Sequence, residues 1–212
     1  MQTNSFLRAL AGLAATACLA ACAPADNPYA SIKDPPLVRA TLHTVTLVSA
    51  DAVLADQLHQ DGFLTMAPVP NYPGAVRVES ALWKVPEEVA AAPVVLLAPS
   101  GRGTNVRLLM TSAQGAVPTV DERVIDDFYR KVLGTAVPQW PGSRSLPASA
   151  RIHAWTFLID DVLAAKRRLR EAGIPVTFDA VAITTAYLGD HKLLGITAPD
   201  GAIVELVESA AH

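Results

Sequence analysis

The chain contains one arrangement of residues twice, and this internal repeat constrains its fold more than any other feature. Residues 43–51 align with residues 153–161 without a gap, histidine on histidine and aspartate on aspartate. Residues 103–110 align with residues 201–208 in the same way, glycine on glycine. Two independent matches of this kind indicate an internal duplication, so we expect two structural modules of one design.

The second module, residues 152–208, carries the clearer signals. Residues 152–159 are rich in aromatic and aliphatic side chains and predict a strand. Asp160 or Asp161 can cap a helix that runs to about Ala172, where a glycine and then a proline end it. Three further strands are predicted over residues 176–184, 193–197 and 202–207.

The first module, residues 39–111, follows the same order less clearly. A strand over residues 42–48 is followed by a helix over residues 52–61. Three strand candidates come next, at residues 75–85, 93–98 and 104–111. Each module therefore reads as β-α-β-β-β, and the chain as an α+β protein.

Residues 112–151 connect the two modules. Val120, Val124, Phe128 and Val132 are spaced by four, which predicts a helix over about residues 119–133. The prolines and glycine that follow predict a loop, so we expect one additional helix that packs on the sheet.

The N-terminus resembles an export signal. Arg8 precedes an alanine-rich apolar run of about 13 residues, which is too short to cross a bilayer but typical of a signal-peptide core. The run ends in Leu19-Ala20-Ala21-Cys22, which resembles the lipobox of bacterial lipoproteins. We therefore expect residues 1–21 to be removed and Cys22 to be the site of lipid attachment. An ordinary signal peptide is the alternative.

The cysteine count agrees with lipid attachment. The chain has two cysteines, Cys18 within the expected signal and Cys22 at its end, so the mature protein would keep one thiol and no internal disulfide. Ala23 rather than aspartate follows Cys22, which favours the outer membrane over the inner one. Residues 22–38 contain four prolines and no periodicity, so we expect a lipid anchor with a flexible tether on an exported protein.

Charge argues against nucleic acid as a partner. The formal net charge is −3 at pH 7, with no basic surplus of the kind that attracts a phosphate backbone. A small molecule is the expected partner, the membrane is reached only through the N-terminal lipid, and the sequence leaves a homodimer open.

The paired modules, the histidine that opens each of them and the closing sequence Pro199-Asp200-Gly201 with Glu205 and Leu206 resemble the vicinal oxygen chelate superfamily. This superfamily includes glyoxalase I, extradiol dioxygenases and bleomycin-resistance proteins. The resemblance covers roughly residues 39–208. It implies that the two modules pair into a curved mixed sheet around a cavity, where some members hold a divalent metal ion.

The resemblance also implies a ligand set for such a metal. By position, the ligands would be the opening histidine and the closing-strand glutamate of each module, which gives His43, His153 and Glu205 here. Arg107 occupies the fourth position, and a guanidinium cannot coordinate a cation. A set of two histidines and one carboxylate is still chemically reasonable for a metal such as iron(II).

The residues themselves allow a second interpretation. Glu205 shares a strand face with Ile203 and Val207, so on an inner face its carboxylate needs a partner, and an ion pair with Arg107 would supply one. The histidines would then be neutral groups in a cavity wall, with Arg107 and Trp155 beside them as ligand-cavity residues.

Two small-molecule functions follow, and the sequence leaves both open, beside a third in which the protein is an envelope interaction module that keeps the fold without a working pocket. One is a metal-dependent lyase, isomerase or dioxygenase in which Glu205 is a metal ligand or a catalytic general base. The other is a metal-free protein that binds or sequesters a small molecule, as in the bleomycin-resistance branch. The presence of Arg107 favours the second.

Overall fold

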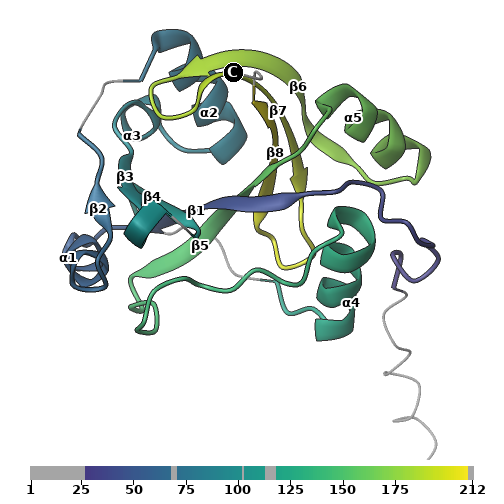
Figure 1. Ribbon diagram of the computed structural model, residues 1–212, viewed down its shortest axis with the longest axis horizontal. Helices are drawn as coiled ribbons and strands as arrows, with labels where there is room; N and C mark the ends of the chain where they lie inside the picture. The colour runs from purple at the N-terminus through teal and green to yellow at the C-terminus, as the bar shows by residue number, and fades with distance from the viewer. Residues whose placement is uncertain (1–26, 68–70, 102, 113–117, 210–212) are drawn as a thin grey trace, which may run out of the picture.

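The computed structural model describes residues 27–67, 71–101, 103–112 and 118–209, and the expected signal segment with Cys22 lies outside these ranges. Eight strands form a single mixed sheet in the order β2-β3-β4-β1-β5-β8-β7-β6 (Figure 1). The order is symmetric about the β1–β5 pair: β4 and β8 flank this pair, β3 and β7 come next, and β2 and β6 form the two edges. This confirms the α+β class and the pairing of two modules in one curved sheet.

The second module has the β-α-β-β-β order, and the first has the same strands and leading helix with further helices inserted between its second and third strands. The first consists of β1 (Thr41–Ser49), α1 (Val53–Gln60), β2 (Leu64–Thr65), β3 (Val94–Leu97) and β4 (Asn105–Met110). The second consists of β5 (Ala150–Leu158), α5 (Val162–Glu171), β6 (Val176–Thr185), β7 (Gly189–Thr197) and β8 (Ile203–Ser209). Between the modules, α4 (Glu122–Asp127) continues into a π-helical turn, η2 (Phe128–Val132), which confirms the helix expected there.

The first module differs from the second in the connection between β2 and β3. Residues 75–85, expected to form a strand, form most of the helix α2 (Pro73–Trp83), which is followed by α3 (Glu87–Ala91). The expectation of a strand was wrong, because the buried residues of α2 recur at helical spacing: Ala75, Val76, Glu79, Leu82 and Trp83. Pro73 at the first helical position also favours a helix start.

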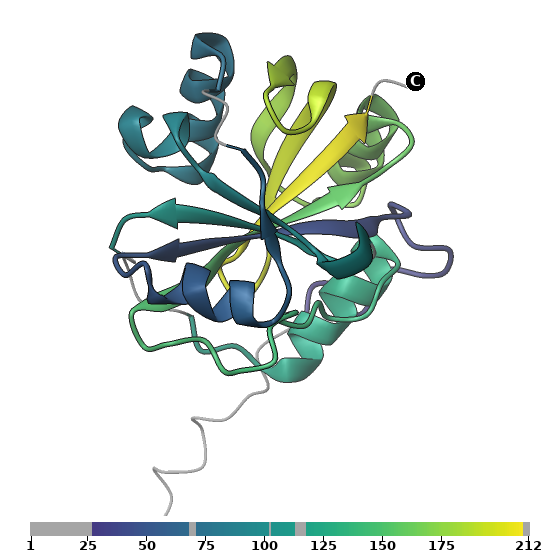
Figure 2. The same ribbon diagram turned by 60° about the vertical axis from the view of Figure 1, so that its left-hand side comes forward.

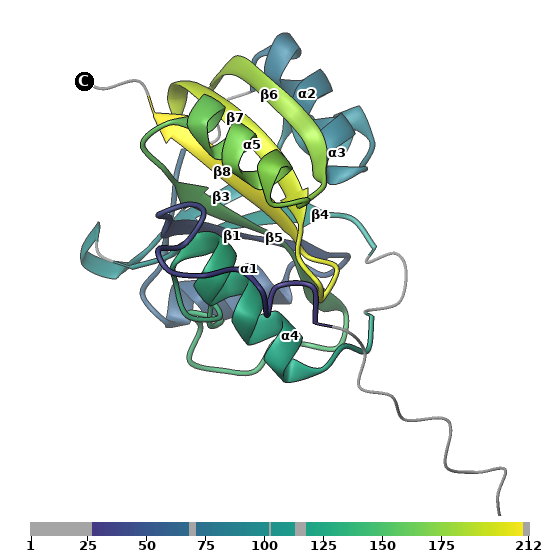
Figure 3. The same cartoon turned by 90° about the vertical axis from the view of Figure 1, so that its right-hand side faces the viewer.

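Helices cover both faces of the sheet. The outer face packs on α1, α5 and the α4–η2 segment, and its core includes Val45, Leu108, Phe157 and Leu206. On the inner face, α2 and α3 form a second core with residues such as Val48, Leu109 and Val207. Figures 2 and 3 show α2 and α3 on the side of the sheet opposite α1 and α4. The inner face is therefore packed against helices over much of its area.

Residues 27–38 do not form the expected free tether. Val38 is buried, and Tyr29, Ile32 and Leu37 pack on the outer core. The backbone amides of Leu37 and Val38 donate hydrogen bonds to carbonyls of η2, at 3.1 and 2.8 Å. Apolar side chains thus outweigh the proline content, and the folded part begins before Arg39. No helix in the described ranges is long and apolar enough to cross a membrane.

Candidate functional site

Four side chains meet at the centre of the inner face, two from each module. In the parallel β1–β4 pair, Thr46 lies beside Arg107, and in the parallel β5–β8 pair, Thr156 lies beside Glu205. Thr46 and Thr156 are equivalent in the repeat alignment, as are Arg107 and Glu205. The antiparallel β1–β5 pair joins the two halves.

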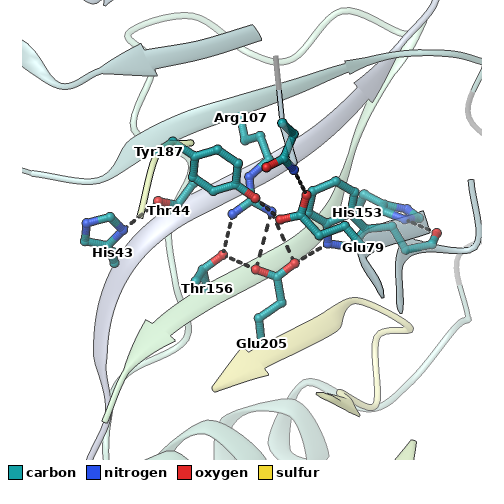
Figure 4. Close-up of polar contacts among 10 residues, drawn as sticks. His43, Thr44, Glu79, Arg107, His153, Thr156, Tyr187 and Glu205 are labelled. Atoms are coloured by element: carbon teal, nitrogen blue, oxygen red, sulfur yellow. Dashed lines mark hydrogen bonds and ion pairs between the residues drawn. The ribbon is translucent and has the colours of Figure 1, made fainter. Parts of the chain in front are cut away.

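Glu205 is held by donors at both carboxylate oxygens. The Nη1 group of Arg107 lies 3.3 Å from Oε1 and 3.4 Å from Oε2. The hydroxyl of Thr156 donates to Oε2 at 2.5 Å, and the indole N–H of Trp83 donates to Oε1. Arg107 is 1% exposed and Glu205 is 4% exposed. The carboxylate is therefore a buried acceptor whose oxygens are both engaged (Figure 4).

Arg107 is also enclosed by two aromatic rings. Its guanidinium carbon lies 4.6 Å from the centroid of the Trp83 ring and 4.7 Å from that of Tyr187. Cation–π attraction of this kind is stronger in a desolvated site than at a surface. The rings keep water away from the guanidinium while stabilising its charge.

A second carboxylate completes the cluster. Glu79 of α2 is 3% exposed and accepts hydrogen bonds from the hydroxyl of Tyr187 and, at 2.5 Å, from the side-chain amide of Asn71. Tyr187 lies in the turn between β6 and β7. The helix inserted in the first module is thus bound to the hairpin tip of the second.

The electrostatics of the cluster follow from burial and from the charge of Arg107. Burial acts to raise the pKa of Glu205, but Arg107, Thr156 and Trp83 outweigh it, so the pKa lies below its ordinary value. Burial acts to lower the pKa of Arg107, but Tyr187, Glu205 and Glu79 together outweigh it, so the pKa lies above its ordinary value and the guanidinium stays charged. For Glu79, burial is the largest influence and raises the pKa from 4.5 to about 7.

The structure does not bring His43 and His153 to Glu205. The Nδ1 atom of His43 lies 2.7 Å from the hydroxyl of Thr44, and the Nε2 atom of His153 lies 2.7 Å from the carbonyl oxygen of Trp83. Figure 4 shows the two histidines on opposite sides of the cluster. Among the described residues, no group of three His, Cys, Asp or Glu side chains could hold a metal ion.

Thr46 and Thr156 occupy the inward positions next to Arg107 and Glu205. They lie three positions after the two histidines, and residues three positions apart on a regular strand point to opposite faces of a sheet. Each histidine also lies at a β-bulge. In the β1–β5 pair, the partners of the consecutive residues Phe157 and Thr156 are Leu42 and Thr44, so His43 is left without a partner residue. In the same way, Thr46 pairs with Ala154 and Leu47 with Ile152, so His153 is the extra residue on β5. A bulge breaks the alternation of side chains between the two faces. The expected metal ligands His43, His153 and Glu205 therefore do not form a site here.

Sequence reasoning found the Arg107–Glu205 pair, as one of two interpretations, but missed Glu79, Thr156 and Tyr187. Glu79 was assigned to a strand that is in fact α2. Thr156 alternates with large apolar residues and so resembles a residue of a solvated strand face. Tyr187 lies in a turn about 108 residues from Glu79, and no local pattern marks such a contact.

A cleft of about 700 Å³ lies next to the cluster, at the end of α2. Trp83, His153 and Trp155 line it, with Lys84 and Arg151 as cations and Asp200 as an acid. Trp155 is 3% exposed and packs in the outer core, so its role as a ligand-cavity residue stays a prediction, and Arg107 is buried beneath Trp83. Trp83 connects the two sites, because its indole N–H binds Glu205 and its carbonyl accepts from His153.

Comparison with known proteins gives similarity of fold only. No protein-family model and no curated protein matches the chain. A solved methylmalonyl-CoA epimerase from Mycobacterium tuberculosis has 19% sequence identity and a TM-score of 0.46, over 85% of this chain and 95% of that one. The epimerase from Streptomyces coelicolor, in complex with 2-nitronate-propionyl-CoA, has 16% identity and a TM-score of 0.44, over 82% and 99%.

A third similar structure is a glyoxalase/bleomycin resistance protein/dioxygenase superfamily member from Vibrio splendidus. It has 14% sequence identity and a TM-score of 0.39, and the match covers 80% of this chain and 100% of that one. At these values the chemistry of this protein must be inferred from its own residues. The paired-module architecture itself rests on strand order and register.

Proposed function

We propose that this protein binds a small molecule without a metal ion, and that the ligand occupies the cleft beside Trp155. The observation that carries the proposal is the engagement of Glu205, whose two oxygens accept from Arg107, Thr156 and Trp83. A carboxylate satisfied in this way is unavailable to a metal. The cleft volume of about 700 Å³ is within the range of small-molecule sites.

A catalytic role for Glu205 finds no support in this geometry. A general base must reach the proton of a substrate within hydrogen-bond distance. Glu205 is buried below Trp83, and the inner face above it is packed against α2. We therefore favour binding or sequestration over proton transfer at this residue.

Two measurements on the same purified protein test the proposal. Elemental analysis after incubation with zinc, nickel, iron(II) or manganese and then desalting should find less than stoichiometric metal. A thermal-shift screen in the presence of a chelator should find small molecules that raise the melting temperature, because a ligand that binds only the folded state stabilises it. Stoichiometric metal that is lost in Glu205→Gln, or a screen in which no compound raises the melting temperature, would refute it.

We further propose that the protein is exported and anchored in the cell envelope by a lipid on Cys22. The support is the sequence alone, namely the apolar run, the lipobox-like residues and the position of the thiol. Metabolic labelling with an alkyne fatty acid should tag the wild type and Cys18→Ser but not Cys22→Ser. Density-gradient separation of the membranes then tests the outer location, and a label retained by Cys22→Ser would refute the anchor.

A further inference from the structure

We propose that β6 is the edge at which two copies of this protein pair, antiparallel and with a two-fold axis at Ile183. The proposal goes beyond the small-molecule function and does not depend on it. β6 is the last strand of the second module's half of the sheet (Figure 1). Among the described strands it pairs with β7 alone, so one side of its backbone has no strand beside it. An open edge of this kind is a template for a further strand.

The two edges of the sheet differ in their protection against such pairing. Proteins protect edge strands by making them short, by charges or prolines, and by bulges. β2, at one edge, has 2 residues, whereas β6, at the other, has 10. In the first half of β6 the register with β7 shifts twice, and Asp179 lies 2.5 Å from Nζ of Lys166 in α5. Residues 181–185 instead pair with β7 in an unbroken register and form the regular part of the open edge.

The composition of this regular part favours pairing. Its sequence is Val-Ala-Ile-Thr-Thr, in which four of the five residues are β-branched. Residues 180–186 contain no charged residue, no proline and no glycine. High β-propensity without charge or proline is typical of segments that add to another strand. The second half of β6 therefore lacks the protection that its first half has.

A cleft lies on each face of the sheet at this edge, and residues 182–184 line both. The first has a volume of about 460 Å³ and apolar walls from the start of α2, including Ala75 and Val78. The second has a volume of about 340 Å³ and is lined by Asp190, Lys192 and Glu208. It lies on the α5 face, because Glu208 accepts from the backbone amide at the start of α5. Side chains of an added strand would enter the two clefts alternately, so the strand should be apolar towards α2 and small or polar towards α5.

β6 itself meets this requirement. Val181 and Ile183 pack on the inner core beneath α2, whereas Ala182 and Thr184 are exposed on the other face. Antiparallel pairing about Ile183 places Ile183 opposite its own copy and Ala182 opposite Thr184 of the second copy. Directly opposite residues of an antiparallel pair share a face, so apolar side chains meet apolar ones on the α2 side. Asp179 lies outside the paired residues, and no like charges face each other.

This self-complementarity commits the edge to a second copy of the chain. A two-fold interface uses one surface on both copies, and that surface must complement itself. Residues 181–185 do so in the alternation of their side chains, in their lack of charge and in their open backbone. The paired sheet would continue from one molecule into the other.

Sedimentation equilibrium of the purified protein tests the pairing. The protein carries Cys18→Ser and Cys22→Ser, so that neither a lipid nor these thiols can join two copies. We expect the mass to approach twice that of one copy as concentration rises. Ala182→Glu should weaken association at least tenfold, because the two glutamates lie diagonally across the joined strands, while Lys192 beside each one accommodates its charge within one copy. Leu64→Glu places the same charge on the β2 edge, at a residue that is 69% exposed, and should leave association unchanged.

Oxidative cross-linking in the same cysteine-free protein tests the register. Ile183→Cys should form a covalent dimer, because directly opposite Cα atoms lie about 4.5–5.5 Å apart, within the range of a disulfide. A mixture of Ala182→Cys and Thr184→Cys proteins, both altered at exposed positions, should cross-link more to each other than to themselves. Leu163→Cys, at a residue of α5 that is 57% exposed, is the control and should stay monomeric.

Three outcomes would overturn the proposal. A protein that stays monomeric at every concentration has no self-pairing edge, and if it then binds a peptide of residues 180–186 the edge takes a foreign strand instead. Association that is unchanged by Ala182→Glu would place the interface elsewhere. Cross-linking of Leu163→Cys as fast as that of Ile183→Cys would exclude the two-fold pairing at β6. The metal analysis and the thermal-shift screen remain separate tests of the proposed function.

Discussion

At the scale of single residues, the buried pair of Arg107 and Glu205 dominates the energetics of the inner face. Moving two charges out of water is costly, and this cost is recovered only where the geometry is good and the remaining donors and acceptors are satisfied. Thr156 and Trp83 complete the partners of Glu205, whereas Arg107 is enclosed by two aromatic rings and its Nε has no hydrogen-bond partner among the described residues. Each charge thus depends on the other for its stability.

Removing one charge should therefore be much worse than removing both. We expect Glu205→Gln and Arg107→Met each to lower the free energy of unfolding by about 3–5 kcal/mol, because each leaves an uncompensated buried charge. The double variant should lose less than the sum of the two. Urea denaturation of the four proteins measures this coupling.

The exposed pair of Arg123 and Asp121 is the matched control. The side chains are 82% and 40% exposed at an N–O distance of 2.9 Å. Since exposed ion pairs contribute little, Arg123→Met should change the free energy of unfolding by less than about 1 kcal/mol. Additive losses for Arg107 and Glu205 would show that the buried pair is not coupled.

Glu79 makes stability depend on pH near neutrality. Burial raises its pKa from 4.5 to about 7, so between these values the folded state binds more protons than the unfolded state. Its contribution is fully present below pH 4.5 and is lost as pH rises through about 7. We expect a loss of up to about 3 kcal/mol over this window and a flatter profile in Glu79→Gln. Urea midpoints measured from pH 5 to pH 8 test this, and an equally steep profile in the variant would contradict it.

At the scale of elements, α2 is the feature that separates this chain from a simple duplication. It is inserted between β2 and β3 of the first module and covers the inner face. Gly195 of β7 lies beside Glu205 in the sheet, directly beneath this helix. A Cβ atom at Gly195 would lie 2.6 Å from Cδ1 of Leu82 and 2.8 Å from Cβ of Phe178. The close approach of helix and sheet therefore requires a glycine.

Gly195→Ala should destabilise the fold by about 1–3 kcal/mol, because the helix or the Phe178 backbone must shift to make room. Gly74→Ala is the matched control, since a Cβ atom there meets nothing within 4 Å. In a helix this change should be neutral or stabilising by up to about 1 kcal/mol. Thermal unfolding of both variants tests the packing of α2, and equal effects at the two positions would contradict it.

The elements also show how far the sequence could predict the structure. The repeat predicted two modules of one design, and the observed strand order, symmetric about β1 and β5, agrees with it. It could not predict α2, whose valines and alanines suit a strand or a helix and whose position depends on a packed inner face. Nor could it predict the bulges at His43 and His153, which depend on the register of two strands about 110 residues apart. For this reason the fold was predicted correctly while the inward-facing side chains were not.

At the scale of the whole molecule, the N-terminal segment belongs to the folded unit. Residues 27–38 run along η2 and contribute Tyr29, Ile32, Leu37 and Val38 to the outer core. Asn27 adds a side-chain hydrogen bond of 2.7 Å to Asp127. If Cys22 carries a lipid, only residues 23–26 separate it from this segment, so a fully extended connection would reach at most about 18 Å.

A protein that starts at Arg39 should therefore be clearly less stable than one that starts at Asn27. The shorter protein loses the buried Val38, three partly buried apolar side chains and the backbone hydrogen bonds to η2. At about 1 kcal/mol for each of these contributions, we expect a loss of up to about 6 kcal/mol in the free energy of unfolding. Urea denaturation of the two purified proteins measures the difference.

The variant Val38→Ala in the longer protein should show part of this loss, because the side chain of Val38 is 3% exposed. Equal stability of the two proteins would mean that residues 27–38 act as a tether after all.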